Sequence, residues 1–362
     1  MKRVSCAFVA SYYGPYYSNY VASVLALETA MQESGFHSVY IFPEEVRNFE
    51  WIHRLEKLTQ NIYYVPYNPQ GIDNLVQLRN IFKKEKINLI YSRMGGWDFL
   101  AHFACPTLPI IWHMDMNVNV ADRKKKIKNW IKFHILGFGK TYHVAVSYVV
   151  RDEINSLHPR NRCIGIPNAL DFSRLSFHAD RETPVPRPAK VLLFGWDPVI
   201  KGLDIALDAM ENANRDGIRY ELLVSVQDQT THYLEKRYQQ VPEWLKLLPP
   251  TDTVAGLSDQ ADIMLSASRS ESFSYCVAEA IYSGLPVVIS DIPGTSWANE
   301  FAGVRSFASG SSTELQRALE CCTSEPMTSA QRQNNRDLMM KKYSMDAWTC
   351  QIMSFIKKVM KI

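Results

Sequence analysis

Residues Ser266 to Gly294 read SASRSESFSYCVAEAIYSGLPVVISDIPG, and this stretch decides the fold. The apolar run ADIMLSAS, which overlaps its start, predicts a buried strand, and SYCVAEAIYS has the spacing of a helix that ends at Gly284. LPVVISD predicts a second buried strand. A strand, a loop, a helix and a strand form the repeating unit of a parallel doubly wound sheet, so the sequence predicts an α/β fold.

The loop RSESFS lies between the first strand and the helix, where ligands bind in such sheets. Seven residues separate Glu271 from Glu279. Eight helical steps would place them about 12 Å apart, which is the length of a nucleoside diphosphate-sugar from its sugar to its ribose. Each carboxylate could accept hydrogen bonds from vicinal hydroxyls, while the diphosphate lies over the N–H groups of Ser272, Phe273 and Ser274. The alternative from spacing alone is two glutamates that cap or pair locally.

The E-x7-E spacing followed by SGLPVVISDIPG resembles the nucleotide-sugar site of retaining glycosyltransferases with the GT-B fold, in particular the large group 1 family (glycosyltransferase family 4). The resemblance implies two Rossmann-like domains that face a central cleft. It runs over most of the chain and is strongest between Lys190 and Gly294. Members usually read E-G-F-G where residues 271–274 here read E-S-F-S. Serine keeps the N–H donors but lacks the access of glycine to positive φ.

The composition is that of an ordinary globular protein. The 362 residues are 46% hydrophobic and 21% charged, and this length fits two domains. The formal net charge of +3 gives no argument for a nucleic-acid partner. No apolar run reaches the ~18 residues of a transmembrane helix, and the short run in MKRVSCAFVASYYG predicts a first strand in place of a signal peptide. Seven cysteines without a C-x-x-C pattern favour free thiols, so we expect a cytoplasmic protein.

Nothing in the sequence has the spacing of a metal site. The nine histidines include no H-E-x-x-H motif, and no D-x-D motif occurs in the chain. The resemblance likewise implies a transferase that needs no metal or other cofactor. In that family, lysine or arginine and a helix N-terminus meet the charge of the leaving group. We therefore expect activity that does not depend on divalent cations.

Alternating strands and helices open the chain. RVSCAFVAS and VASVLALETAMQESG predict a strand and a helix around the aromatic turn YYGPYYSNY, whose Gly14 resembles the family's glycine loop near the donor phosphate or acceptor. The alternative is a plain turn glycine. LPIIWHMD predicts a buried strand that ends in His113 and Asp115, where the family places a histidine close to the transferred sugar. His113 is thus a candidate polar contact on the acceptor side, and the alternative is a core histidine.

The segment 123–135, RKKKIKNWIKFHI, mixes basic and apolar residues around Trp130. A solvated helix face explains this pattern. The sharper interpretation is an interfacial helix on anionic lipid headgroups, where each basic residue contributes about 1 kcal/mol. That suits an enzyme with a lipid-linked acceptor, peripheral on the inner face of a membrane. No nucleic-acid-binding module accompanies these residues, so we expect no nucleic-acid partner.

CIGIPNALDFSRL resembles the segment in which the family crosses from one domain to the other, with Ala169 in place of the usual glycine. We place the boundary near Pro167. Residues 1–167 then form an acceptor-side domain, and residues 168–343 form the nucleotide-sugar-binding domain. The resemblance implies that the terminal helix 344–362 returns to the first domain.

KVLLFGWDPVIKGLDIALDAM opens the second domain with the family's order of a strand, a glycine, a K-G pair and a helix. This order implies that Gly195 lies at the donor and that Lys201 supplies positive charge to the departing diphosphate, with a solvated loop lysine as the alternative. Trp196 occupies the position where the family usually has arginine. Arg269, two residues before Glu271, is a candidate replacement for that second cation, or an exposed loop arginine.

Together these residues predict a retaining glycosyltransferase of the hexosyltransferase type. It would move a sugar from a nucleotide diphosphate-sugar, with UDP favoured, to the hydroxyl of a glycan or lipid-linked acceptor in bacterial cell-surface polysaccharide or glycoconjugate synthesis. Lys201, Glu271 and His113 are the expected catalytic residues, and Glu279 is the expected ribose contact. The alternatives are a non-catalytic GT-B subunit that positions a partner transferase and a GT-B sugar-nucleotide epimerase.

Overall fold

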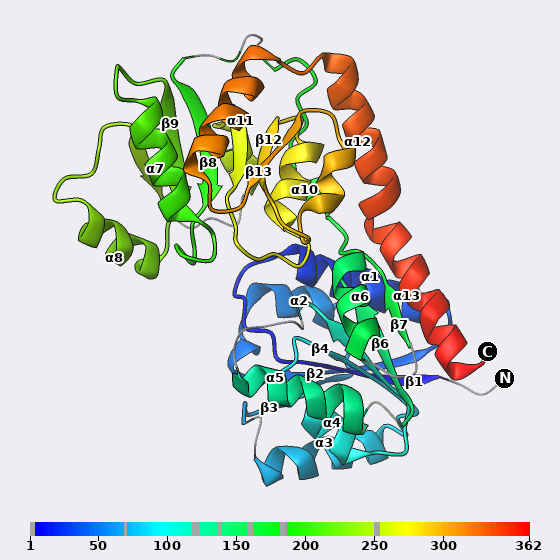
Figure 1. The fold of residues 1–362 in the computed structure, drawn as a ribbon. Helices are drawn as coiled ribbons and strands as arrows, with labels where there is room; N and C mark the ends of the chain where they lie inside the picture. The colour runs from blue at the N-terminus through cyan, green and yellow to red at the C-terminus, as the bar shows by residue number, and fades with distance from the viewer. Residues whose placement is uncertain are drawn as a thin grey trace. The chain divides into compact units, whose positions relative to one another are not determined.

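The computed structural model describes residues 4–68, 71–117, 123–136, 139–157, 162–181, 185, 187–249 and 254–362. The chain forms two compact units (Figure 1). We call Met1–Ala169 with Met345–Ile362 the N-terminal unit, and Leu170–Ser344 the C-terminal unit. Each unit has one parallel sheet with helices packed on it, as the alternation of strands and helices in the sequence predicts.

The sheet of the N-terminal unit has seven strands in the order β3-β2-β1-β4-β5-β6-β7. These strands are β1 (Ser5–Ala10), β2 (His37–Pro43), β3 (Ile62–Val65), β4 (Leu89–Arg93), β5 (Ile110–Met114), β6 (Thr141–Ala145) and β7 (Cys163–Gly165). The helices of this unit are α1 (Asn19–Glu33), α2 (Glu50–Glu56), α3 (Ile72–Lys84), α4 (Asp98–Ala104), α5 (Arg123–Trp130), α6 (Tyr148–Leu157) and α13 (Met345–Met360).

The sheet of the C-terminal unit has six strands in the order β10-β9-β8-β11-β12-β13. These strands are β8 (Ala189–Phe194), β9 (Tyr220–Ser225), β10 (Leu245–Leu248), β11 (Ile263–Ser266), β12 (Val287–Asp291) and β13 (Val304–Ala308). The helices of this unit are α7 (Leu203–Ala213), α8 (Asp228–Arg237), α9 (Val254–Asp259), α10 (Tyr275–Tyr282), α11 (Ser312–Ser324) and α12 (Ser329–Tyr343).

The order of the strands reverses at one place in each sheet. β1 pairs with both β2 and β4, and β8 pairs with both β9 and β11. In doubly wound sheets, ligands bind outside the carboxyl ends of the strands at such a reversal. We call these two places the switch points. Ser11 and Met94 follow the strands at the first switch point, and Gly195 and Ala267 follow the strands at the second.

The last helix, α13, packs against α1, and its Trp348 and Ile352 are buried in the core of the N-terminal unit. These two side chains are four residues apart and therefore lie on one face of the helix. The structure confirms the expected return of the terminal helix. The two units meet in sequence between Ala169 and Leu170 and again between Ser344 and Met345, within two residues of the expected boundaries.

The decisive stretch folds as predicted, into β11, α10 and β12. Glu271 lies in the loop before α10, where the sequence placed it, and α10 begins at Tyr275. The expected separation of about 12 Å assumed eight helical steps and therefore does not follow from helix rise. The sequence patterns predicted no element at the position of α12. Its signal was the T-x-x-Q spacing of Thr328 and Gln331, which form a capping box.

Candidate active site

The loop between β8 and α7 places Lys201 at the switch point of the C-terminal unit. Lys201 N–H donates to the carbonyl of Asp197 (2.8 Å), and the next residue, Gly202, has a φ of +67°. A Cβ on Gly202 would lie 2.0 Å from the carbonyl oxygen of Ala267, just after β11. Glycine is therefore required here, because it lets the loop of one strand touch the end of the next.

Lys201 and Glu271 meet directly. Lys201 Nζ donates to Glu271 Oε1 at 2.6 Å, and Ser268 Oγ donates to the same oxygen at 2.8 Å. Each side chain of the ion pair is 11% exposed. The two residues are 70 positions apart, so this contact brings together two motifs that are distant in the sequence and that the resemblance assigned to one site. Ser268 was missed there, although it lies three residues before Glu271.

The backbone of Gly294 packs closely against the backbone of Glu271. A Cβ on Gly294 would lie 1.9 Å from the carbonyl oxygen of Glu271, closer than real Cβ contacts. The terminal glycine of the SGLPVVISDIPG motif is thus needed for close backbone approach. Gly195 is tight as well, since a Cβ there would lie 2.9 Å from Val224 Cγ1.

Arg269 is held by other groups. Its guanidinium donates to both carboxylate oxygens of Asp204, at 2.8 and 2.7 Å, and to the carbonyl of Val199 at 2.7 Å. The hydrogen bond from Arg269 lowers the pKa of Asp204. We expected Arg269 to supply positive charge at the donor, but its guanidinium forms an ion pair with Asp204. The contact ties the loop of Lys201 to the loop of Glu271.

The residues that lead into α10 have distinct environments. Ser272 is half-buried, whereas Phe273 is 3% exposed and stacks on Trp297 with ring centroids 5.0 Å apart. The side chain of Phe273 is thus part of the core. Ser274 has a φ of +63°, the region that glycine adopts without strain. Among the described residues, the positive φ falls on the second serine of E-S-F-S and not on Ser272.

Cys276 connects the expected site residues. Burial raises the pKa of its thiol to about 11, and the charges of Lys201, Glu271 and Glu279 all act on it. Glu279 itself is 5% exposed in α10. The three charged residues thus lie around the first turns of one helix, whose N-terminal N–H groups favour an anion. Cys276 was not singled out from the sequence.

Trp196 adds an aromatic face to this site. The Nζ of Lys201 lies 5.0 Å from the centroid of the Trp196 ring, and the Trp196 side chain is 49% exposed. This is the geometry of a cation–π contact. The position at which the resemblance led us to expect arginine thus holds a neutral side chain that contacts the lysine.

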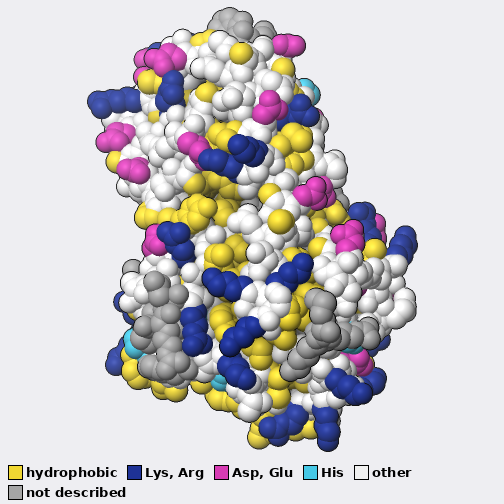
Figure 2. Space-filling view, turned by 90° about the vertical axis from the view of Figure 1, so that its right-hand side faces the viewer, with side chains coloured by type: hydrophobic (Ala, Val, Ile, Leu, Met, Phe, Trp, Pro, Cys, Tyr) yellow, Lys and Arg dark blue, Asp and Glu magenta, His cyan; other side chains and the backbone are white. Residues whose placement is uncertain are grey.

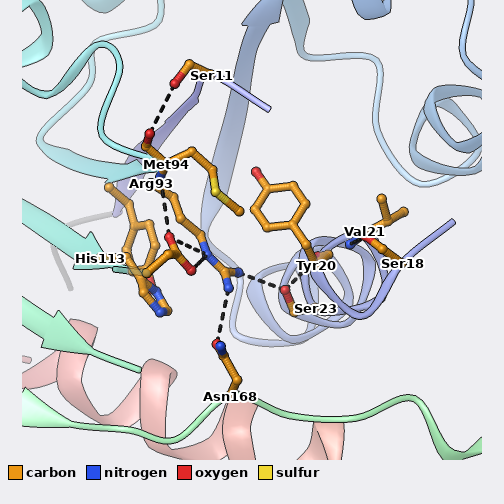
Figure 3. A network of polar contacts seen from close by, with 11 residues as sticks. Ser11, Ser18, Tyr20, Val21, Ser23, Arg93, Met94, His113 and Asn168 are labelled. Atoms are coloured by element: carbon orange, nitrogen blue, oxygen red, sulfur yellow. Dashed lines mark hydrogen bonds and ion pairs between the residues drawn. The ribbon is translucent and has the colours of Figure 1, made fainter. Parts of the chain in front are cut away.

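Figure 3 shows the polar network at the switch point of the N-terminal unit. Arg93, at the end of β4, lies between α1, which carries Ser23, and the segment that carries Asn168. Its Nε donates to Asp115 at 3.0 Å, with side-chain exposures of 7% and 13%. Met94, the residue after Arg93, has a φ of +67° and donates its N–H to Asp115. Arg93 was not singled out from the sequence.

His113 lies beside this network (Figure 3). Its Nδ1 shares a hydrogen bond of 2.6 Å with the hydroxyl of Tyr91, and its side chain is 2% exposed. Burial, helped by the charge of Arg93, holds the pKa of His113 well below its usual range, so the imidazole is neutral. Burial also raises the pKa of Asp115, against the effect of Arg93. Within the described part of the chain, His113 Nε2 has no hydrogen-bond partner.

A cavity of about 340 Å³ opens beside these side chains. His113, Asp115 and the strained Met94 line it together with Lys128 of α5. The cavity combines apolar thioether surface with a carboxyl group and a buried nitrogen, as small-molecule sites commonly do. Gly14 lies elsewhere in this unit, where its carbonyl accepts the indole N–H of Trp51 at 2.9 Å and a Cβ would collide with Tyr12.

The segment 123–135 has two faces. Ile127, Trp130 and Ile135 are each more than half exposed, which fits the expected interfacial surface. Lys132 and Phe133 are buried, contrary to the expected alternation, because Lys132 pairs with buried Asp98 beneath the helix. Residues 121 and 122, which precede this segment, lie outside the described residues.

The N-terminal unit is basic and the C-terminal unit is acidic. The N-terminal unit has 23 Lys and Arg against 14 Asp and Glu, a net charge of +9, and the C-terminal unit has 17 against 23, a net charge of −6. Figure 2 shows Lys and Arg side chains gathered over the N-terminal unit, in the lower half of the view. The small net charge of the chain thus conceals a strong asymmetry.

The described residues contain neither a metal-binding cluster nor a membrane-spanning helix. No group of three or more His, Cys, Asp or Glu side chains there could hold a metal ion. No helix built from those residues is both long and apolar enough to cross a bilayer.

Residues 188–324 match a family model described as glycosyl transferases group 1. The match extends from β8 to α11 and contains Gly195, Lys201, Glu271 and Glu279. No curated protein sequence matches the chain. The family evidence therefore falls on the C-terminal unit, where the sequence motifs are strongest.

Solved glycosyltransferases share the fold of the whole chain. A glycosyltransferase from Rickettsia africae has a TM-score of 0.78 at 14% identity, with 100% of both chains covered. HepE from Anabaena in complex with UDP has a TM-score of 0.77 at 13% identity, covering 98% of this chain and 100% of that one. Sucrose-phosphate synthase from Thermosynechococcus elongatus has a TM-score of 0.75 at 14% identity, covering 99% and 100%. The expected GT-B fold is confirmed for the chain, and the expected resemblance to the group 1 glycosyltransferases is confirmed over residues 188–324.

Proposed function

We propose that the protein is a retaining, metal-independent glycosyltransferase that moves a sugar from a nucleoside diphosphate-sugar to an acceptor hydroxyl. One observation carries this proposal. Lys201 and Glu271, 70 residues apart in sequence, are hydrogen-bonded at the switch point of the unit that matches the group 1 model. The first turn of α10 lies beside them and offers N–H groups to an anion.

Each residue of this site has a distinct role. Lys201 stabilises the β-phosphate as the bond from the sugar to phosphate breaks, together with the N-terminus of α10. Glu271 accepts hydrogen bonds from hydroxyls of the donor sugar and orients it. Glu279 binds the ribose hydroxyls. The acceptor attacks from the face that the diphosphate leaves, and the departing phosphate takes the acceptor proton, so the anomeric configuration is retained.

UDP is the favoured nucleotide. Structures of HepE from Anabaena with UDP and with UDP-glucose share the fold of this chain at TM-scores of 0.77 and 0.74. The charge of the diphosphate is met by lysine and a helix terminus in place of a metal ion. Gly195, Ser272, Phe273 and Ser274 contribute backbone surface to the donor, whereas the side chain of Phe273 stays in the core.

The cavity of the N-terminal unit is the acceptor site of this proposal. With Tyr91 as the donor to Nδ1, the neutral His113 carries its proton on Nε2 and can donate it to a sugar or acceptor oxygen. Asp115 supplies an acceptor for a hydroxyl group. A cyclic polyol fits this cavity, with hydroxyls at the polar end and C–H faces along the methionines. Such an acceptor is a glycan or a lipid-linked glycan of cell-surface polysaccharide or glycoconjugate synthesis.

The exposed face of segment 123–135 is the membrane-contact surface of this proposal. Ile127, Trp130 and Ile135 supply apolar surface on a unit with a net charge of +9, which suits an anionic bilayer. Vesicles with and without phosphatidylglycerol test this contact by co-sedimentation. Trp130→Ser with Ile127→Ser should reduce binding to the anionic vesicles, whereas Ile72→Ser, which changes a 77% exposed side chain of the same unit, should not. Equal binding of all three proteins would refute the membrane contact.

A donor panel tests the transferase directly. The protein is incubated with UDP-, GDP-, ADP- and dTDP-sugars, and release of free nucleoside diphosphate is measured with and without EDTA. We expect slow hydrolysis of one donor that EDTA does not abolish. Lys201→Met should lower the rate about 10²- to 10³-fold, as loss of one group that stabilises transition-state charge does. Lys246→Met, which changes an exposed strand lysine of the same unit, is the matched control.

Two outcomes of the panel favour the other candidates. Binding without release of nucleotide from any donor supports a non-catalytic subunit, which is favoured by Trp196 in place of the family's usual arginine and by the serines at 272 and 274. Conversion of a UDP-sugar to its epimer supports an epimerase. A putative UDP-N-acetylglucosamine 2-epimerase from Listeria monocytogenes shares the fold at a TM-score of 0.63 and 9% identity, covering 99% of this chain and 97% of that one.

A further inference from the structure

The ammonium of Lys201 lies between two unlike partners. On one side Glu271 Oε1 accepts its hydrogen bond at 2.6 Å, and on the other the ring centroid of Trp196 is 5.0 Å from Nζ. An ammonium group that is paired with a carboxylate presents little net charge to an anion. The aromatic face attracts the ammonium through its quadrupole and leaves the full positive charge available.

Donor binding would remove the hydrogen bond between Lys201 and Glu271. When Glu271 turns to the hydroxyls of the donor sugar, Lys201 loses the carboxylate that holds it in the ligand-free protein. A lysine side chain has a flexible four-carbon stem and loses rotamer entropy when it is fixed. A neutral contact that persists in the complex therefore reduces the cost of holding the ammonium at the diphosphate.

Arg269, the cation two residues before Glu271, does not provide that restraint. The guanidinium of Arg269 is held by both oxygens of Asp204 and contacts the loop of Lys201 at the carbonyl of Val199. A guanidinium in place of the indole of Trp196 would place a like charge beside Lys201. The neutral indole of Trp196 can therefore contact the Lys201 ammonium without repelling it.

We propose that Trp196 is a positioning residue, which holds the ammonium of Lys201 at the donor diphosphate while Glu271 binds the sugar. The inference rests on the proposed function, because the diphosphate is the ligand that Lys201 meets there. The family usually has arginine at this position, so its pattern does not predict that Trp196 positions the lysine.

A comparison of UDP with uridine tests this role by calorimetry, because uridine lacks the phosphates. Trp196→Leu should weaken UDP binding about 3- to 10-fold, the range of a partly exposed cation–π contact, and should leave uridine binding unchanged. Trp196→Phe keeps a ring and should recover most of the loss. Ile218→Ala, which removes an exposed apolar side chain of the same unit, is the control and should have no effect.

The Lys201→Met background decides whether Trp196 acts through the lysine. There, Trp196→Leu should change UDP affinity by less than about 2-fold, because the cation that it positions is gone. An equal loss in both backgrounds, or an equal loss for uridine, would show that Trp196 contacts the nucleotide itself and would overturn the inference. Unchanged UDP affinity in Trp196→Leu alone would overturn it as well.

Failure of the inference can be separated from failure of the proposed function. In the ligand-free protein, the ring current of Trp196 should shift the ε-methylene protons of Lys201 in the NMR spectrum, and Trp196→Leu should abolish that shift. Absence of the shift contradicts the inference alone. Absence of binding of UDP, GDP, ADP and dTDP to the unaltered protein contradicts the proposed function and removes the inference with it.

Discussion

The two units carry similar ion pairs at their switch points but surround them differently. In the N-terminal unit Arg93 is bonded to Asp115, and also to Ser23 and Asn168. In the C-terminal unit Lys201 is bonded to Glu271 and otherwise rests on the ring of Trp196. A guanidinium with several fixed acceptors is a structural connection, whereas a lysine with one acceptor can exchange that acceptor for a ligand. The comparison thus separates an ion pair with several fixed partners from an ion pair that, in the proposed function, opens when the donor binds.

The largest expected effect is the loss of the structural pair. Arg93→Met leaves Asp115 buried without its counter-charge, and we expect it to lower the free energy of unfolding by about 3–5 kcal/mol. Lys201→Met should cost less stability, because it removes a side chain with one such bond. Urea unfolding of the two variants measures the difference. The double variant Arg93→Met/Asp115→Asn should recover part of the loss, and equal losses for Arg93→Met and Lys201→Met would erase the distinction between the pairs.

The next effect concerns the backbone behind Glu271. Gly294→Ala places a Cβ 1.9 Å from the carbonyl oxygen of Glu271, and we expect a loss of stability of about 1–3 kcal/mol together with weaker binding of UDP-sugars. Thermal unfolding and calorimetry measure the two changes. Gly256→Ala in α9 is the control, since its Cβ would meet nothing within 4 Å. Similar behaviour of the two variants would show that Gly294 does not position Glu271.

A smaller effect comes from the buried histidine of the N-terminal unit. Burial holds the pKa of His113 below its unfolded value, so the unfolded chain binds more protons than the folded one as the pH falls below about 6.5. The stability from neutral His113 is therefore present above that pH and is lost below it, with a slope of at most about 1.4 kcal/mol per pH unit. His113→Gln should flatten this dependence in unfolding measured from pH 7.5 to 5. An unchanged slope would contradict a neutral, buried imidazole.

The smallest expected effect concerns strained backbone, which both units place after a strand at the switch point. Ser274, the last residue of the loop between β11 and α10, has a φ of +63°, and Met94, directly after β4, has a φ of +67°. Ser274→Gly should relieve about 1–2 kcal/mol of strain and lose about half of that gain to the greater freedom of unfolded glycine. Ser272→Gly, at a residue without positive φ, should destabilise slightly. Melting temperatures that fall in both variants would contradict the strain at Ser274.

The sequence predicted the fold well because its signals are local. A strand, a loop and a helix appear in ADIMLSASRSESFSYCVAEAIYS within about 25 residues, and Gly284 follows the helix. The resemblance also placed Lys201 and Glu271 at one site. The distance between Glu271 and Glu279 could not be predicted from their spacing. It depends on where α10 begins, and that start is set by the strained turn at Ser274.

The rest depends on contacts between distant residues. Arg93 and Ser23 are 70 positions apart, and no local pattern marks their hydrogen bond. Lys132 reads as one of several lysines on a basic helix, yet it is buried because Asp98 lies beneath it. The pairing of Arg269 with Asp204 likewise follows from how the two loops meet. Such pairings are set by tertiary packing, which single-sequence patterns do not contain.

The structure of the complex with UDP tests the central claim most directly. In a crystal structure of the protein with UDP, we expect Lys201 Nζ within hydrogen-bond distance of a β-phosphate oxygen, Glu279 on the ribose hydroxyls, and the ring of Trp196 still beneath the ammonium. UDP bound at another place, with the bond from Lys201 to Glu271 unchanged, would contradict the account.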